Sequence, residues 1–290
     1  MSSSQGTILV TGTNGGLGSA IVTNILGKPE LARNYTGVYT VRKAAMATRL
    51  QQVLKSAPDY HRHDVLDLDL GSLAGVRTMT TEIDRRVAAG DLPPIRALIL
   101  NAGYQDHEEI SMSEDGYEMS WQVNFLANQL LTLLLVQSMD KENGRILLIG
   151  SWSYDVNDER NNTNIECYKG YDSLFPGPEE LAKGVWSRPD SGGGRLTGYR
   201  RYGILAPVIS LQARFKPNGE FRPLWKSAED AVQLTFETKG QPGKLLYLNG
   251  TDELETGKEA RDDTKRKALW RYGLEAAGIE QGDTFLNRWQ

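Results

Sequence analysis

The chain has 290 residues and a formal net charge of −4 at pH 7, so its electrostatics do not favour nucleic acid or an anionic membrane as a partner. Its length is sufficient for one large α/β domain with a fully buried sheet. Cys167 is the only cysteine, which excludes an internal disulfide and suits a reducing compartment. The first residues, MSSSQGTILVTG, lack a signal-peptide pattern, and the apolar run LLTLLLV is too short to span a bilayer. We therefore expect a cytoplasmic protein.

Strand-like and helix-like segments alternate along the first half of the chain. This alternation predicts a single α/β domain of the Rossmann-like type, with a doubly wound parallel sheet covered by helices on both faces. The expected strands are residues 7–12, 36–41, 63–70, 95–103 and 144–151, and the expected helices are residues 16–27, 44–55, 71–89 and 115–138.

The regular pattern decays after Ser151. Residues 152–200 contain glycine clusters, prolines and an Asn-rich patch, with one short helix expected at 178–185. We interpret this segment as a loop over the carboxyl edge of the sheet, where open α/β sheets bind ligands. Regularity returns with a helix at 226–238, a strand at 243–250 and a polar terminal helix. The single domain thus divides into residues 1–151, which form a coenzyme half, residues 152–200, which form a substrate loop, and residues 201–290, which form a shortened C-terminal half.

The stretch VTGTNGGLGSAI places Gly12, Gly16 and Gly18 between the first strand and the first helix. Glycines there permit backbone conformations barred to other residues and let a pyrophosphate approach N–H groups at the positive end of a helix. A plain turn is the alternative. The position after the first strand of an alternating chain favours a dinucleotide site.

The spacing Thr-Gly-x3-Gly-x-Gly resembles the short-chain dehydrogenase/reductase family, and further motifs follow in the family's order over residues 7–151. The C-terminal tail resembles a fungal branch with many reductases of secondary-metabolite pathways. The resemblance implies coenzyme contacts from Gly12, Asn14, Gly16, Leu17 and Gly18, from Asp69 and Leu70 at the adenine, and from Asn101, Ala102 and Gly103; it also implies Asn124 as the structural asparagine and Ser151 as the catalytic serine.

The end of the second strand discriminates between the two nicotinamide coenzymes. NAD readers place an acid there for the ribose 2′-hydroxyl, whereas NADP readers supply an arginine for the 2′-phosphate. This strand ends Thr40-Val41-Arg42-Lys43, with no acid, and Arg42 can hold a phosphate in a fork. The alternative is that Arg42 is a solvated surface residue. We predict NADP(H).

The resemblance also implies a catalytic tyrosine that precedes a lysine by four residues, because a phenol of pKa about 10 needs a nearby cation to act as a base at neutral pH. No tyrosine after Ser151 has such a lysine. Tyr202 is the best match, but Ala206 occupies the lysine position and Pro207 ends any helix there. Compared with the family, the chain reads as if a block were missing between about Gly203 and Ala206.

Two consequences follow from such a missing block. The sheet loses a strand, so either residues 144–151 and 243–250 pair directly or residues 204–210 fill the place as a strand weakened by proline. Catalysis loses its fixed cation, for which Arg195, Arg200 or Arg201 could substitute.

Other candidate sites carry weaker signals. Residues 61–64, His-Arg-His-Asp, have a metal-like composition that is more typical of a solvated loop, and we predict no metal site. Ser153 or Tyr154 could take the place of Ser151. Asp155 and Asp158 have no nearby histidine, so the sequence does not support a Ser-His-Asp hydrolase.

The sequence therefore predicts an NADP(H)-dependent oxidoreductase that interconverts a carbonyl and an alcohol in a small metabolite, with Ser151, Tyr202 and Asn124 as its catalytic residues. One alternative is a pseudoenzyme, or a non-redox cyclase or isomerase on the same fold. Another is a mis-spliced gene model of a full-length reductase. Relatives of this kind often form homodimers, and the substrate is not encoded in any readable motif.

Overall fold

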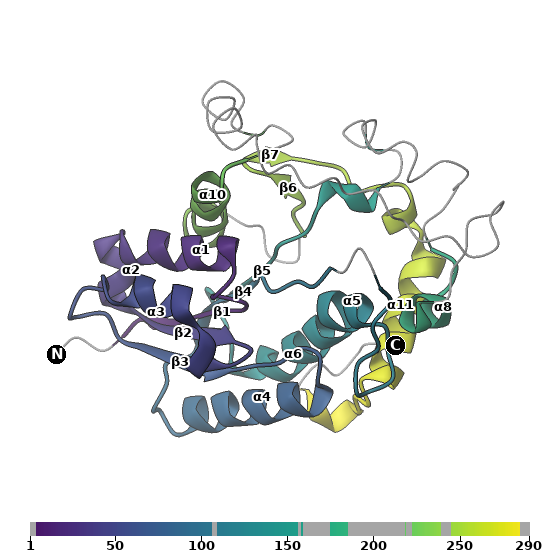
Figure 1. Ribbon diagram of the computed structural model, residues 1–290, viewed down its shortest axis with the longest axis horizontal. Helices are drawn as coiled ribbons and strands as arrows, with labels where there is room; N and C mark the ends of the chain where they lie inside the picture. The colour runs from purple at the N-terminus through teal and green to yellow at the C-terminus, as the bar shows by residue number, and fades with distance from the viewer. Residues whose placement is uncertain are drawn as a thin grey trace.

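The computed structural model describes residues 4–105, 109–155, 158, 175–184, 218, 222–238 and 245–284. At its centre lies a five-stranded parallel sheet with the order β3-β2-β1-β4-β5 (Figure 1). The doubly wound parallel sheet that the alternating pattern predicts is confirmed. The strand order reverses between β1 and β4, and this switch point creates a crevice at the carboxyl ends of the strands. The strands are β1 (Gly6–Val10), β2 (Tyr35–Val41), β3 (His63–Asp67), β4 (Ile95–Leu100) and β5 (Arg145–Leu148).

Helices cover both faces of the sheet (Figure 1). Successive strand residues point to opposite faces, so Ile8 packs with the helices of one layer and Leu9 with those of the other. Both side chains are fully buried, which marks the sheet as the core of the domain. One layer contains α1 (Gly16–Leu26), α3 (Thr48–Leu54) and α10 (Leu224–Phe236); the other contains α4 (Leu73–Ala88) and α6 (Ala127–Leu135).

The helix α10 packs against α1, although some 200 residues separate them in the chain (Figure 1). It begins after Pro223, whose fixed φ and extended backbone suit the position before a helix. Its buried residues Ala228, Ala231 and Val232 recur at helical spacing and join the same core cluster as α1. The C-terminal part of the chain thus completes the layer that carries the glycine-rich turn.

Residues 245–250, the described part of the strand expected at 243–250, do not extend the central sheet. Only β6 (Leu248–Asn249) forms there, and it pairs antiparallel with β7 (Asp252–Glu253) in a separate two-residue ladder. Gly250 has φ of +64° and allows the tight turn between them. The expectation that residues 144–151 pair directly with 243–250 is therefore wrong among the described residues, where β5 pairs with β4. The alternative strand at 204–210 lies outside the described residues.

The helix expected at 115–138 begins four residues later, at Met119. The carboxylate of Glu118 accepts a hydrogen bond from the backbone N–H of Trp121 and so caps the first turn, α5 (Met119–Trp121). A π-helical turn at Gln122–Leu126 then leads into α6. The helix expected at 44–55 is likewise broken, into a 3-10 turn at Ala44–Met46 followed by α3.

Several short elements complete the described chain. A helix that the sequence pattern missed, α2 (Pro29–Asn34), starts with proline at a position that needs no backbone donor. The helix α8 (Pro178–Lys183) packs against α11 (Asp263–Ala276). The carboxylate of Asp262 caps the N-terminus of α11. No helix among the described residues is long and apolar enough to cross a membrane. The remaining 3-10 turns are Val136–Ser138, Trp152–Tyr154, Glu259–Arg261 and Gln281–Asp283.

His61, in the segment with metal-like composition, has a structural role. Its Nδ1 donates to the backbone carbonyl of Ala32 at 2.8 Å, because a carbonyl only accepts. Its Nε2 must then accept from the hydroxyl of Tyr39, at 3.0 Å. The ring is 6% exposed, and burial lowers the pKa of His61 below its ordinary value of 6.5. Within the described residues, no group of three His, Cys, Asp or Glu side chains is arranged to hold a metal.

Acid should destabilise the fold through His61. Since its pKa is lower in the folded state, the unfolded chain binds the proton first, and the free energy of unfolding should fall as the pH drops below about 6.5. The variant His61→Gln has no titrating group at this position, so its stability should depend less on pH. Urea unfolding at several pH values from 8 to 5 measures both slopes. An equally steep decline in the variant would assign the acid sensitivity to other groups.

Candidate active site

The turn after β1 brings three stretches of backbone into close contact. Gly12 has φ of +69°, and a Cβ there would meet Cα of Ala102 at 2.8 Å. A Cβ on Gly18 would fall 2.3 Å from the carbonyl oxygen of Gly12. Both positions therefore require glycine, one for its conformation and for space, the other for space alone. The turn predicted from the glycine spacing is present between β1 and α1.

The N-terminus of α1 lies at the crevice formed at the carboxyl ends of β1 and β4, and no side chain caps it. Gly15 is the N-cap residue, and no side chain bonds to the N–H groups of the first turn. A Cβ on Gly16 would lie 3.5 Å from Nη1 of Arg49 and 3.1 Å from Cδ1 of Leu224. The backbone donors, the helix dipole and the Arg49 guanidinium together make a surface suited to a pyrophosphate. The residues present thus fit the phosphate part of a dinucleotide.

The side chain of Thr11 joins the carboxyl ends of β1 and β4. Its hydroxyl oxygen accepts from the backbone N–H groups of Asn101, at 3.0 Å, and Ala102, at 2.9 Å. In return, the side-chain amide of Asn101 donates to the carbonyl oxygen of Thr11 at 2.8 Å. The predicted coenzyme residues Asn101 and Ala102 are therefore placed beside the glycine-rich turn by reciprocal hydrogen bonds.

Two other residues of the turn have mainly structural contacts. The side-chain oxygen of Asn14 accepts from the backbone N–H groups of Arg49, at 3.1 Å, and Leu50, at 3.2 Å. This bond holds the turn against the start of α3. Leu17 is half-buried and packs against the core beneath the turn. Asn14 thus positions the turn through its side-chain oxygen, and Leu17 anchors the turn in the core.

The two residues predicted at the adenine differ in exposure. Asp69 is exposed, and its Oδ1 accepts from the backbone N–H of Gly71 at 2.9 Å, in the turn before α4. Leu70 is only 4% exposed, because its side chain packs in the core with α4 and α6. The structure thus leaves Asp69 at the surface near the strand ends, while the Leu70 side chain belongs to the core.

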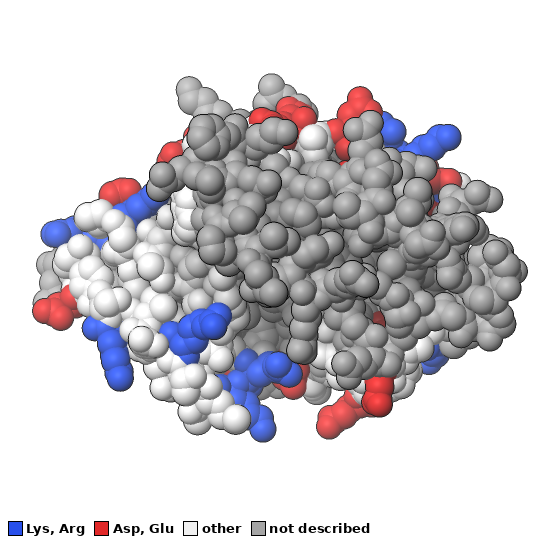
Figure 2. All heavy atoms as spheres, turned by 45° about the horizontal axis from the view of Figure 1, so that its top comes forward, with Lys and Arg blue, Asp and Glu red and all other residues white. Residues whose placement is uncertain are grey.

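A basic surface follows the end of β2. Arg42 and Lys43 are exposed directly after this strand, and Arg49 is exposed near the glycine-rich turn. The nearest carboxylate in the adjacent strand, that of Asp67, accepts from the backbone N–H of Ala44 at 2.6 Å. Figure 2 shows basic side chains, in blue, gathered at the lower left of that view. The position predicted to read the adenosine ribose therefore carries positive charge.

Asn124 lies in the π-helical turn Gln122–Leu126 and hydrogen-bonds to the loop after β4. Its Oδ1 accepts from the backbone N–H of Tyr104, and its Nδ2 donates to the carbonyl oxygen of Tyr104, each at 2.8 Å. A Cβ on Gly103 would lie 3.4 Å from the same Oδ1. The π-helical turn at Gln122–Leu126 widens the helix at this residue, and such turns occur frequently at functional sites.

Ser151 is exposed and lies three residues after Leu148, the last residue of β5. The N–H of Ile149 donates to the carbonyl oxygen of Leu100 at 3.0 Å. Ser151 and the Asn101–Gly103 segment therefore follow neighbouring strands at the same edge of the sheet. The phenol oxygen of Tyr154, the other serine replacement considered, accepts a hydrogen bond from the backbone N–H of Gly257 at 2.7 Å. Tyr202, the side chain of Ser153 and most of residues 152–200 lie outside the described residues.

Sequence reasoning missed three residues that shape this site. Thr11 stands directly before the first glycine of the motif, and its hydroxyl joins two strands. Arg49 lies in a helix seven residues beyond Arg42, with no motif to single it out. Leu224 reaches Gly16 from the far end of the chain, and only the packing of α10 on α1 brings it there.

A parallel sheet with a glycine-rich turn at its switch point defines a dinucleotide-binding type of fold. Residues 6–161 match the family model described as short chain dehydrogenase. The chain is 36% identical to the short-chain dehydrogenase iccH of Talaromyces variabilis, in an alignment that covers 99% of each chain. The chain belongs to the short-chain dehydrogenase family, which is a family of oxidoreductases.

The alignment with iccH spans 362 positions, 72 more than the 290 residues of this chain. The relative therefore carries at least 72 residues without a counterpart here. A second fungal relative, the short-chain dehydrogenase/reductase phmF of Phaeosphaeria nodorum, is 32% identical over 49% of this chain and 39% of its own. A crystal structure of an uncharacterized protein from Mycobacterium Paratuberculosis shares the fold, with a TM-score of 0.59, 19% identity, and coverage of 96% of this chain and 95% of that one.

Removing the hydroxyl of Thr11 should loosen the crevice. The variant Thr11→Val leaves the half-buried N–H group of Ala102 without this acceptor and leaves that of Asn101 with only the carbonyl oxygen of Ile99, at a cost of about 1–3 kcal/mol of unfolding free energy. Thr11→Ser keeps the hydroxyl and should lose less. Urea unfolding of the two variants gives the comparison, and equal stability of both would show that the hydroxyl bonds contribute little.

Proposed function

We propose that this chain is an NADP(H)-dependent oxidoreductase that interconverts a carbonyl and an alcohol in a small metabolite. The observation that carries the proposal is the juxtaposition of an uncapped helix N-terminus with the guanidinium of Arg49, together with the exposed Arg42 directly after β2. In this proposal residues 1–151 hold the coenzyme and residues 152–200 select the substrate. Membership of the family supports a nicotinamide coenzyme.

The choice of NADP(H) over NAD(H) rests on charge. A guanidinium binds a phosphate through two parallel N–H groups, and a carboxylate in the same place would repel it. Arg42 and Lys43 directly follow β2, where an NAD-binding protein would have an acidic residue. The carboxylate of Asp67 accepts a hydrogen bond from a backbone N–H. In the proposed complex Arg42 contacts the 2′-phosphate, while the glycine-rich turn and Arg49 contact the pyrophosphate.

The proposed chemistry needs a polarised carbonyl and a proton. A bound nicotinamide supplies or accepts a hydride at the carbonyl carbon. Ser151 donates a hydrogen bond to the carbonyl oxygen, and Tyr202 donates the proton that this oxygen takes up during reduction. Asn124 holds the loop after β4 in position through its two bonds to Tyr104. At neutral pH a phenol is already protonated, so reduction is the direction that these residues support better.

The absence of a lysine four residues after any tyrosine beyond Ser151 lowers the expected rate. If that ammonium acts like one preorganised donor, its loss costs about 3–4 kcal/mol, or a factor of about 10²–10³. The 72 additional alignment positions of the iccH relative support a block missing from this chain. We propose that this block contained the lysine.

The missing lysine also favours a second candidate, a protein that binds the coenzyme without redox turnover. Such a pseudoenzyme, or a cyclase or isomerase, retains the crevice and does not need a cation beside the tyrosine. A transcript that restores the block would return the chain to the reductase class. Sequencing the transcript across codons 200–210 separates this possibility from the other two.

Arg42 should determine coenzyme preference. The variant Arg42→Ala removes a charge-assisted hydrogen bond to the 2′-phosphate and should weaken NADPH binding about 10- to 100-fold, with NADH binding unchanged. Lys55→Ala, at the exposed end of α3, is the matched control and should bind both coenzymes as the wild type does. Titration calorimetry measures the affinities. NADPH binding that survives Arg42→Ala would contradict the assignment.

Turnover should depend on Ser151. With NADPH and a panel of ketones, Ser151→Ala should lower kcat/KM about 10²–10³-fold, because it removes one donor to the developing oxyanion. Ser56→Ala, which changes an exposed serine at the end of α3, is the control and should leave the rate unchanged. Consumption of NADPH, followed by its absorbance, measures the rate. Tight NADPH binding without turnover in the wild type would favour the pseudoenzyme.

A further inference from the structure

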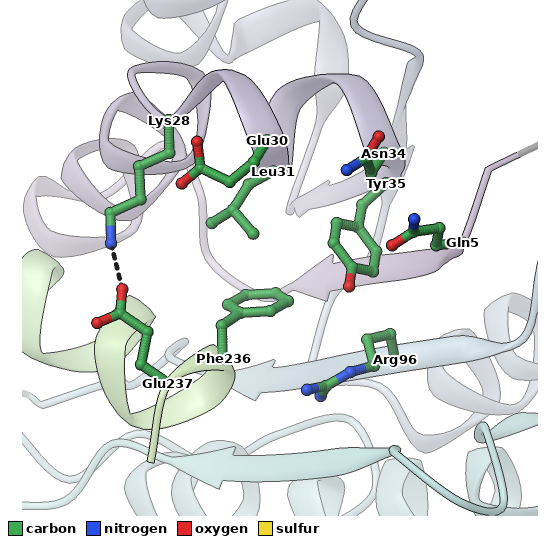
Figure 3. Close-up of a pocket in the computed structure, with 9 residues that line it drawn as sticks. All are labelled: Gln5, Lys28, Glu30, Leu31, Asn34, Tyr35, Arg96, Phe236 and Glu237. Carbon is green, nitrogen blue, oxygen red and sulfur yellow. Dashed lines mark hydrogen bonds and ion pairs between the residues drawn. The ribbon is translucent and has the colours of Figure 1, made fainter. Parts of the chain in front are cut away.

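A cavity of about 270 Å³ lies at the amino-terminal edge of the sheet, at the opposite end of the strands from the glycine-rich turn. Tyr35 is the first residue of β2, Arg96 is near the start of β4, and Phe236 ends α10. Figure 3 shows these side chains converging from the three elements. The size is near the lower end of the range of small-molecule pockets, which begins at about 300 Å³.

Arg96 gives this cavity a positive charge that the described residues leave unsatisfied. Its Nη1 is buried and no described residue accepts a hydrogen bond from it. The guanidinium carbon lies 5.3 Å from the centre of the Phe236 ring, an arrangement that orients the group but supplies no lone pair. Burial and the neighbouring charge of Arg96 lower the pKa of Arg145, so two cationic groups lie near each other here. A buried donor of this kind favours an anionic acceptor.

Leu31, Tyr35 and Phe236 form the apolar part of a mixed lining that also contains Gln5, Lys28, Glu30, Asn34, Arg96 and Glu237. The rings of Tyr35 and Phe236 lie 5.4 Å apart at 53° to each other, and Leu31 is only 6% exposed. The hydroxyl of Tyr35 points toward the side of the cavity where Arg96 lies (Figure 3). A flat apolar group fits between such walls because aromatic side chains contribute a large contact area and a polar tip.

The rim limits how much negative charge a ligand can carry. Glu237 is neutralised by Lys28, whose Nζ lies 2.8 Å from its carboxylate (Figure 3). Glu30 is exposed at the rim and would repel a second negative charge on the ligand. One half-buried guanidinium and one rim carboxylate therefore suit a single carboxylate better than a phosphate or a dicarboxylate.

We propose that this cavity binds a small organic monocarboxylate with a flat apolar body. The carboxylate accepts a hydrogen bond from the guanidinium of Arg96, which lines the cavity, and the apolar body lies against Phe236 and Leu31. The site shares no residue with the crevice at the glycine-rich turn, so it is independent of the proposed oxidoreductase function.

Calorimetry with benzoate, in the presence of saturating NADPH, tests the proposal. The wild type should bind benzoate at least about tenfold more tightly than benzamide, the neutral molecule of the same shape, since a hydrogen bond to a charged group is worth at least one factor of ten. Arg96→Leu should weaken benzoate binding by a similar factor. Arg33→Leu, which removes an exposed arginine of α2 that lies over the ring of Tyr60, is the control and should bind as the wild type does.

Three results would overturn the proposal: no saturable binding of benzoate, equal binding of benzoate and benzamide, or unchanged affinity in a folded Arg96→Leu variant. If that variant does not fold, Phe236→Leu keeps Arg96 and removes only the aromatic face. It should weaken benzoate binding about two- to tenfold, and unchanged affinity would equally overturn the proposal. Competition between benzoate and NADPH would place the ligand in the other crevice and would also overturn it.

Discussion

The carboxyl ends of β1 and β4 approach so closely that a side chain on Gly12 or Gly18 would collide with backbone atoms. The hydroxyl of Thr11 makes this approach stable, because it accepts from two backbone N–H groups of the neighbouring strand end. The N-terminus of α1 takes its direction from the same turn. This contact between strand ends brings the N–H groups at the N-terminus of α1 into one crevice with Asn101. It also places there the segment that leads to Asn124.

Other parts of the molecule are arranged around that crevice. Asn14 ties the turn to α3, which brings Arg49 beside the start of α1. The packing of α10 on α1 places Leu224 against Gly16 at one end. At its other end, the same helix contributes Phe236 to the cavity with Arg96. One helix from the C-terminal part of the chain therefore borders both candidate binding regions, at opposite edges of the sheet.

The first half of the chain follows the sequence pattern closely. Short buried strands and amphipathic helices alternate there, and each helix packs on the strands next to it in the sequence, so local periodicity and tertiary packing agree. The differences occur where a side chain or a distant segment decides. Glu118 starts its helix four residues later than the pattern suggests. The described residues 245–250 contribute only β6, which pairs with β7 in a two-residue ladder rather than joining the central sheet. Neither outcome is visible in hydrophobic periodicity.

The sequence by itself determined the parallel α/β architecture, the glycine-rich turn and the basic end of β2, because spacing and residue type are local properties. It also determined that no tyrosine beyond Ser151 precedes a lysine by four residues. Only the tertiary structure decided that Leu70 is a core residue, that Arg49 lies beside Gly16, and that Arg96 faces a cavity without a partner among the described residues. These facts depend on which distant segments pack together, and packing follows from complementarity across the whole core rather than from any short stretch of sequence.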